Sequence, residues 1–216
     1  MKKMNSMNLQ KVKDFIFSRK CSICGRIVNE TGRYLCVDCC SILKKKGQIK
    51  NVENYFFLFY YEKDIKNVIA DYKLKNRRNL SIELGFFVKK PLINLIKEKE
   101  IDIIIPVPIS KERYRERGFN QVELLLETMN IPYEKIEKIR NTKHMYDLLD
   151  EKSREENIKN AFYNYLDLND KNILLVDDIV TTGKTIQEII NELYKNTNPK
   201  NIFIFSIALS KVFKKI

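Results

Sequence analysis

The chain has 216 residues, 44% of them hydrophobic, which is enough for one ordinary domain with a packed core and a small appendage. Its net charge of +12 favours anionic partners: phosphorylated small molecules, nucleic acid or an anionic membrane surface. No apolar run approaches the ~20 residues that a membrane helix requires, and the basic N-terminus lacks the apolar centre of a secretory signal. We therefore expect a cytoplasmic protein.

Four of the five cysteines form two Cys-x-x-Cys pairs separated by eleven residues: Cys21, Cys24, Cys36 and Cys39. Two pairs at this spacing can converge on one zinc ion, and Gly25 permits the tight turn after the first pair. A reducing compartment favours zinc over disulfides, although an iron–sulfur cluster or a redox pair would use the same thiols. Cys40 could compete with Cys39 as a ligand. Because all-cysteine sites are closed, we expect a structural rather than a catalytic metal.

The residues around these pairs predict a small zinc-binding module that spans residues 1–50. Asn8–Phe17 has the pattern of a short amphipathic helix that packs on this module. Ser41–Lys50 indicates a basic helix or linker, with consecutive lysines at Lys44–Lys46. This lysine run is either a solvated face or a contact for nucleic acid. Residues 51–216 then form a second domain.

In the second domain, apolar segments typical of buried strands alternate with segments of helical periodicity. The expected strands are Asn54–Tyr61, Ile101–Val107, Asn201–Leu209 and two shorter ones, Tyr133–Ile139 and Ala161–Tyr165. The expected helices are Asp64–Lys75, Ser81–Lys97 and Phe119–Thr128, with Pro91 predicted to kink or divide the second of them. This alternation predicts an α/β fold with a mostly parallel sheet that helices cover on both faces.

Some side chains of this domain have two interpretations each. The polar segment Asn141–Asn157 lacks a clear period, and we expect it to be mobile. It contains the only histidine, His144, which is either an exposed loop residue or a ligand contact. Tyr60 and Tyr61 belong either to an aromatic core or to a surface on which a base could stack.

The most informative stretch of the chain is Lys171–Glu188. It begins with an apolar run, Ile173–Val176, which two acids follow, Asp177 and Asp178. A polar turn, Thr181–Thr185, then leads into a helical pattern. Backbone N–H groups at the start of a helix suit a phosphate. Carboxylates at the end of a strand suit hydroxyls or a hydrated metal ion. The stretch therefore predicts a site for a sugar that carries a terminal phosphate.

Two other interpretations of this stretch are weaker. The letters GKT occur in the Walker A loop, but that motif needs a glycine five residues before Gly183, where Asp178 stands. An ordinary strand–turn–helix with a capping threonine and solvated acids would show the same local pattern.

A second group of charged residues follows the expected strand Ile101–Val107. The loop after Pro108 carries four cations within seven residues: Lys111, Arg113, Arg115 and Arg117. Loops that follow parallel strands open at the same edge of the sheet, and arginine can bind pyrophosphate through two parallel hydrogen bonds. The alternative is a solvated basic loop.

The stretch LLVDDIVTTGKT resembles the phosphoribosyl-pyrophosphate (PRPP) signature of type I phosphoribosyltransferases. The wider order of motifs is similar to that of the ComF family of competence-associated proteins: two Cys-x-x-Cys pairs, a strand with a basic segment, the block Arg117–Gln121 (RGFNQ) and VDDIVTTGKT. The resemblance extends from about Lys20 to Leu209. Further matching positions are Arg140, Thr142, Leu148, Arg154, Asn157 and Phe162, whereas Met145 stands where the family shows glutamine.

The resemblance implies a role for each matching residue. Asp177 and Asp178 would contact the ribose hydroxyls of PRPP, and a magnesium ion would bridge these hydroxyls and the pyrophosphate. The 5′-phosphate would lie against Thr181, Thr182, Gly183, Lys184 and Thr185. The pyrophosphate would lie against Lys111, Arg113, Arg115 and Arg117. Such a site acts by positioning and charge stabilisation, without a protein nucleophile, and Asn141–Asn157 would be its lid.

The resemblance also implies a function. A ComF-like protein would bind PRPP and act in DNA uptake during natural transformation, where it would handle incoming single-stranded DNA in the cytoplasm with a competence helicase as a candidate partner. The net charge of +12 agrees with a nucleic-acid partner. The alternative is an active phosphoribosyltransferase that transfers ribose 5-phosphate from PRPP to a nucleobase or amine acceptor.

Overall fold

The computed structural model describes residues 19–28, 32–74, 77–139 and 161–213. Within these ranges, no helix has the length and apolarity needed to cross a membrane. The expected helix Asn8–Phe17 and the polar segment Asn141–Asn157 with His144 lie outside the described residues. So do the family-like positions Arg140, Thr142, Met145, Leu148, Arg154 and Asn157.

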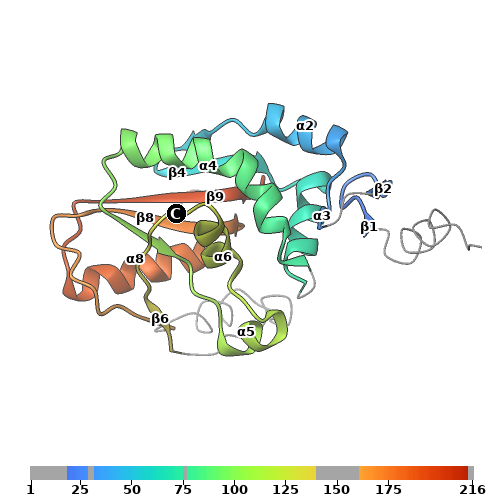
Figure 1. Cartoon of the computed structure of the whole chain (residues 1–216). Coiled ribbons are helices and arrows are strands. Elements are labelled where there is room, and N and C mark those ends of the chain that lie inside the picture. The colour runs from blue at the N-terminus through green and yellow to red at the C-terminus, as the bar shows by residue number, and fades with distance from the viewer. Residues whose placement is uncertain (1–18, 29–31, 75–76, 140–160, 214–216) are drawn as a thin grey trace, which may run out of the picture.

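A five-stranded sheet forms the centre of the molecule (Figure 1). Four of its strands are parallel, and the short edge strand β3 runs antiparallel to β4. In spatial order the strands are β3 (Lys50–Val52), β4 (Tyr55–Tyr60), β9 (Asn201–Leu209), β8 (Asn172–Val180) and β5 (Ile103–Pro106). The prediction of a mostly parallel α/β sheet is confirmed.

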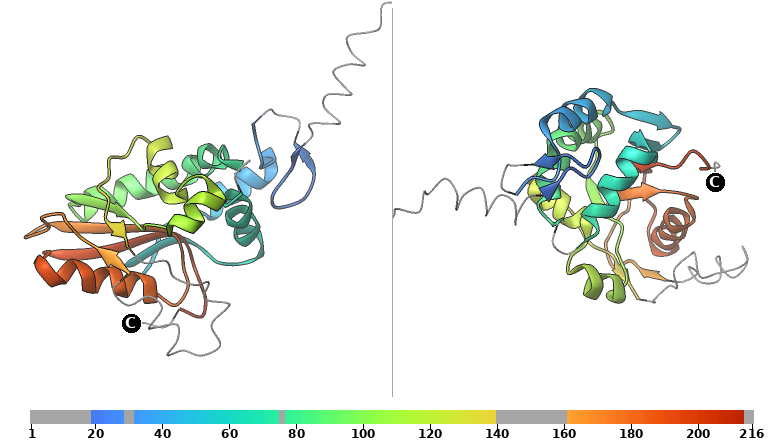
Figure 2. Two further views of the ribbon diagram at one scale, coloured as in Figure 1. Left: turned by 90° about the horizontal axis from the view of Figure 1, so that it is seen from below. Right: turned by 90° about the vertical axis from the view of Figure 1, so that its right-hand side faces the viewer.

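Helices cover both faces of this sheet (Figure 2). One face packs against α2 (Val37–Lys46), α3 (Lys63–Tyr72), α4 (Leu80–Glu98) and α6 (Gln121–Thr128). The other packs against α8 (Lys184–Asn196) and a ribbon of β6 (Glu137–Lys138) and β7 (Phe162–Tyr163). Each face has its own hydrophobic core, the first under α2, α3, α4 and α6 and the second under α8 and the ribbon. Leu174 and Val176 of β8 face the first core, whereas Ile173 and Leu175 face the second. Because β8 is buried on both sides, its sequence is continuously apolar up to the acids.

The segment after Pro108 contains a helix, α5 (Lys111–Arg117), so the prediction of a basic loop was wrong. The Ser110 hydroxyl accepts a hydrogen bond from the Arg113 backbone N–H (3.3 Å) and caps the first turn. Gly118 ends the helix with a φ of +78°, a left-handed conformation that glycine adopts without strain. These caps fix the basic residues on a helical surface with distinct faces.

Two other expected elements differ from the structure. Tyr133–Ile139 contributes only β6, which pairs antiparallel with β7 and does not join the main sheet. Pro91 was predicted to kink or divide the helix around it; the helix is not divided, since all 19 residues of α4 are helical. Val88 and Leu92 are buried on either side of the proline, and this packing outweighs the one backbone hydrogen bond that proline cannot donate.

The basic segment expected at Ser41–Lys50 is mostly helical. α2 begins at Val37, inside the second Cys-x-x-Cys pair, and ends at Lys46. The three consecutive lysines occupy its last turn, where positive charge interacts favourably with the helix dipole. Before α2, strands β1 (Arg19–Lys20) and β2 (Ile27–Val28) form a small hairpin.

The cysteine region packs directly on α4. Leu35 belongs to the same hydrophobic cluster as Leu84 of that helix. The buried carboxylate of Glu83 accepts hydrogen bonds from the backbone N–H groups of Tyr34 (2.8 Å) and Leu35 (3.0 Å). A buried carboxylate is costly without such donors, so this contact fixes the segment that leads into Cys36.

Candidate functional site

The acidic pair lies within the last part of β8 rather than after it, because β8 continues to Val180. Asp177 is in register with Ser206 of β9, and β5 ends at Pro106 beside Val176. The two acids therefore lie at the carboxyl edge of the sheet, close to the segments that follow β5 and β8. This edge is where parallel α/β sheets bind ligands.

Asp178 is held by a lysine that the sequence did not single out. Lys73, which follows α3, places its Nζ 2.9 Å from Asp178 Oδ2 and 3.2 Å from Oδ1. Asp178 is 8% exposed, and the Lys73 side chain is 27% exposed. Both charges are largely withdrawn from water, so each is stabilised by the other. Lys73 has the local pattern of an exposed residue near a helix end, which is why sequence reasoning missed it.

The negative charge of Asp177 is offset less completely than that of Asp178. Burial, reinforced by the negative charge of Asp178, raises the pKa of the Asp177 carboxyl to about 7. Lys73, the Asp178 backbone N–H and Arg113 act in the opposite direction. That N–H donates to Asp177 Oδ1 at 2.7 Å. A carboxyl whose pKa is perturbed in this way, at a ligand-binding edge, is a candidate for contacting substrate hydroxyls or a cation.

The helix α5 divides the four cations predicted to bind pyrophosphate between two faces. Arg113 and Arg117 are four positions apart, on one face, and both are partly buried. Burial lowers the pKa of Arg117, and the charge of Asp178 opposes this shift. Lys111 and Arg115 lie on another face and are exposed. The structure therefore brings Arg113 and Arg117 to the acids, but not the other two.

The turn after β8 leads into a helix without a side-chain cap. Gly183, at the N-cap of α8, is buried and has a φ of +79°, which a residue with a Cβ would adopt only under strain. Thr181 and Thr182 are exposed beside it, and Lys184 and Thr185 form the start of the helix. This arrangement can offer threonine hydroxyls and backbone N–H groups to an anion.

Two further side chains lie beside the charged groups of the site, Lys138 in the field of Asp177 and Gln121 against Arg117. Lys138 of β6 is partly buried, and burial, together with the charge of Arg113, lowers its pKa to about 8 against the opposing charge of Asp177. Gln121 is buried at the start of α6, where its Oε1 accepts a hydrogen bond from Arg117 Nη1 (2.9 Å). Among the described residues, its Nε2 has no hydrogen-bond partner. Gln121 ends the RGFNQ block, whereas no sequence signal marks Lys138.

The four predicted cysteines form one cluster. The Sγ atoms of Cys21, Cys24, Cys36 and Cys39 all lie within 4.8 Å of one another. Cys24 Sγ and Cys36 Sγ are 3.7 Å apart. In a tetrahedral site with Zn–S bonds of about 2.3 Å, the sulfur atoms lie about 3.8 Å from one another, so this distance fits. The Cys36 backbone N–H also points to Cys21 Sγ, at 3.4 Å. The donor set and its spacing fit a zinc ion.

The fifth cysteine is separate from this cluster. Cys40 is half-buried; burial raises the pKa of its thiol, with Arg33 and Glu83 as its charged neighbours. On the exposed side of the cluster, Arg26 Nε donates to Cys24 Sγ at 3.4 Å, and this contact lowers the pKa of the Cys24 thiol to about 6. Because Cys39 Sγ lies within the cluster and Cys40 is not part of it, Cys39 is the fourth cysteine of the set.

The comparisons with known proteins agree with this arrangement. Residues 111–211 match the family model of the phosphoribosyl transferase domain. Competence protein ComFC of Streptococcus pneumoniae is 27% identical over 202 residues, which cover 87% of this chain and 86% of that protein. These two similarities support a ComF-family protein of the type I phosphoribosyltransferase-like class.

Two other similarities are more partial. The DNA utilization protein YhgH of Shigella flexneri is 36% identical over 101 residues, and this match spans 44% of either chain, less than half the length of that relative. A crystal structure of a purine phosphoribosyltransferase from Pyrococcus horikoshii Ot3 is 22% identical and covers 63% of this chain and 78% of its own, with a TM-score of 0.38.

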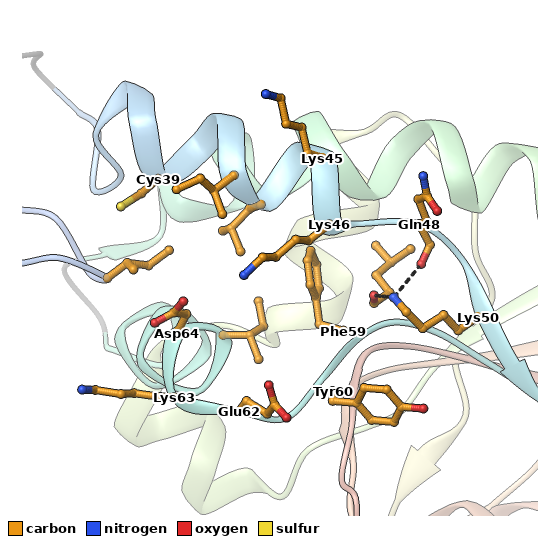
Figure 3. A pocket seen from close by; sticks show the side chains of 15 residues that line it. Cys39, Lys45, Lys46, Gln48, Lys50, Phe59, Tyr60, Glu62, Lys63 and Asp64 are labelled. Atoms are coloured by element: carbon orange, nitrogen blue, oxygen red, sulfur yellow. Dashed lines mark hydrogen bonds between the residues drawn. The ribbon is translucent and has the colours of Figure 1, made fainter.

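A cleft of about 570 Å³ lies between α2 and the segment that joins β4 to α3 (Figure 3). Lys46 points into the cleft, whereas Lys45 points away from it. The ion pair with Lys211 and, to a smaller extent, the charge of Lys46 lower the pKa of Glu62. Tyr60 lies at the edge of the cleft and is 43% exposed, so it is not a core residue. Tyr61 packs partly buried against the first core.

Two cysteine variants test which thiols bind metal. We expect wild-type protein to hold about one zinc ion per chain, Cys24→Ser to lose it, and Cys40→Ser to retain it. Zinc content after gel filtration, measured by mass spectrometry, gives the answer. Retention of zinc by Cys24→Ser with its loss from Cys40→Ser would contradict the assignment.

The Asp177→Asn variant tests the perturbed carboxyl. The unfolded carboxyl ionises near pH 3.9, and the folded one near pH 7, so ionisation lowers the stability of the wild type as the pH rises between these values. We expect the ligand-free variant to match the wild type near pH 4 and to exceed it by roughly 1–3 kcal/mol at pH 8. Urea denaturation at several pH values measures this difference, and parallel stability curves would disprove the shift.

Proposed function

We propose that this ComF-family protein binds PRPP with magnesium at the carboxyl edge of its sheet. One observation carries the proposal: a partly desolvated acid pair, two arginines and an uncapped helix start meet at the end of β8. A phosphorylated sugar has hydroxyls for the acids and two separate anionic groups for the cations and the helix start. The family model that covers residues 111–211 supports this ligand class.

Each part of the ligand has a proposed set of contacts. The ribose hydroxyls lie against Asp177 and Asp178, and the 5′-phosphate lies against the turn Thr181–Thr185. The pyrophosphate lies against Arg113 and Arg117, with the exposed Lys111 and Arg115 outside this contact. Magnesium, when bound with PRPP, would offset the negative charge of the pyrophosphate, and the carboxylates of Asp177 and Asp178 are oxygen ligands that suit it.

The same residues would support transfer of ribose 5-phosphate to an acceptor. The arginines would stabilise the leaving pyrophosphate, and the acids would hold the ribose in position while positive charge develops on its ring. The four-cysteine cluster would hold structural zinc, since no coordination position is left for a substrate.

We further propose that the protein handles single-stranded DNA in the cytoplasm. The net charge of +12 and the exposed cations Lys44, Lys45, Lys111 and Arg115 support an anionic macromolecular partner. The names of the relatives, a competence protein and a DNA utilization protein, point to the same class of function.

Titration calorimetry of PRPP with magnesium into zinc-loaded protein tests the first proposal. We expect saturable binding by the wild type and at least a hundredfold loss, about 2.7 kcal/mol, in the Asp177→Asn/Asp178→Asn double variant. Thermal denaturation would show that the double variant is folded. A folded wild type that binds no PRPP would refute the proposal.

The salt dependence of DNA binding tests the second proposal. Replacement of Lys44, Lys45 and Lys46 by alanine should weaken binding of an oligothymidine and lower the slope of log affinity against log salt by about 0.7 per lost phosphate contact. The matched control is Lys89→Ala/Lys90→Ala, which removes two exposed lysines from α4. Equal slopes for the wild type and both variants would exclude this lysine run, and the exposed pair Lys111 and Arg115 would be tested next.

A further inference from the structure

The ion pair between Lys73 and Asp178 occupies the position that the proposed ligand needs. Lys73 Nζ lies within hydrogen-bond distance of both carboxylate oxygens of Asp178, at 2.9 and 3.2 Å. A ribose hydroxyl that donates to this carboxylate must share these oxygens with the ammonium or displace it. One of the two proposed ribose contacts is thus already paired with Lys73 in the described structure.

Displacement leaves the ammonium in need of a new anionic partner. The Lys73 side chain is only 27% exposed, so water alone would compensate its charge incompletely. The other acid near Lys73 is Asp177, but burial raises the pKa of its carboxyl to about 7, and it is itself proposed to bind a ribose hydroxyl. Arg117 is positive and lies in the field of Asp178. Tyr72, the preceding residue, donates its hydroxyl to the Gln121 backbone carbonyl (2.8 Å). A bound ligand is therefore the natural source of the missing negative charge.

We propose that Lys73 is a ligand-contacting residue that moves from Asp178 to a pyrophosphate oxygen when PRPP binds. This inference rests on the proposed function. In the exchange, the ribose hydroxyls replace Lys73 as donors to Asp178, and the pyrophosphate replaces Asp178 as the partner of Lys73. Every charge keeps a partner of opposite sign or a hydrogen-bond donor, so neither state contains an unpaired buried charge.

The fold supports such a movement without a change in the backbone. Lysine carries its charge on a flexible four-carbon chain, so its ammonium can swing while the residue stays in place. The Lys73 backbone N–H is held by the carbonyls of Ile69 and Ala70, both at 3.2 Å, at the end of α3. Arg117, which lies in the field of Asp178, is held by a hydrogen bond to Gln121. The two cations thus approach Asp178 from different elements, α3 and α5, and can bind one anion between them.

The experiment compares three ligands with three variants. Magnesium-saturated PRPP, pyrophosphate and ribose 5-phosphate are each titrated into zinc-loaded wild type, Lys73→Met, Lys73→Arg and Lys66→Met. Lys66 is an exposed lysine of α3, the helix that Lys73 follows, and serves as the matched control. Thermal denaturation confirms that every variant is folded before it is titrated.

We expect Lys73→Met to weaken pyrophosphate and PRPP by about tenfold or more, the equivalent of one charged hydrogen bond. Ribose 5-phosphate should bind within about threefold of the wild-type affinity or more tightly, because Asp178 is no longer occupied and the 5′-phosphate lies elsewhere. Lys73→Arg should restore most of the pyrophosphate affinity, and Lys66→Met should behave as wild type.

Other results overturn the proposal. Equal weakening of all three ligands would assign Lys73 a purely structural role as the partner of Asp178. Unchanged pyrophosphate affinity in Lys73→Met would show that the lysine does not reach the ligand. A wild type that binds none of the three ligands would refute the proposed function itself, which is a different outcome from failure of the Lys73 variants alone.

Discussion

The packing of β8 between β9 and β5 is the constraint on which the rest of the molecule depends. The strand is buried by one hydrophobic core on each face, so its register cannot shift by one residue without exchanging the two cores. This register fixes Asp177 and Asp178 at the carboxyl edge and starts α8 directly beyond Gly183. The position of the candidate site thus follows from apolar burial, while its chemistry comes from residues that contribute little to the core.

The cations around the acid pair come from separate parts of the chain. Lys73 follows α3, Arg113 and Arg117 belong to α5, and Lys138 lies on β6. Each is partly buried, so its charge acts through a medium that screens it less than water does. These four cations partly offset the negative charge of the two acids, and the site keeps an excess of positive charge for an anionic ligand. The pKa shifts of Asp177, Arg117 and Lys138 share their causes, which are burial and the charges of this one cluster.

The sequence predicted the sheet, its helical cover, the acid pair and the four cysteines because each leaves a local signal in periodicity or spacing. It did not predict α5 as a helix, since the density of charge obscured the Ser110 and Gly118 caps. It could not identify Lys73, whose contact with Asp178 joins residues 105 positions apart. It placed Lys111 and Arg115 with Arg113 and Arg117, because only the helical geometry separates their faces. Local patterns predict elements, but long-range pairing decides which charges meet.

The shared packing of the cysteine region and α4 has a consequence for the protein in the cell. Cys21 and Cys39 belong to the same hydrophobic cluster as Leu84, and Glu83 holds the segment before Cys36. Metal binding at the four thiolates would therefore add its free energy to the folding of the main domain as well as to that of the small hairpin. Metal starvation or thiol oxidation would therefore destabilise the main domain together with the small hairpin. The supply of metal would thus set how much of this protein a cell retains.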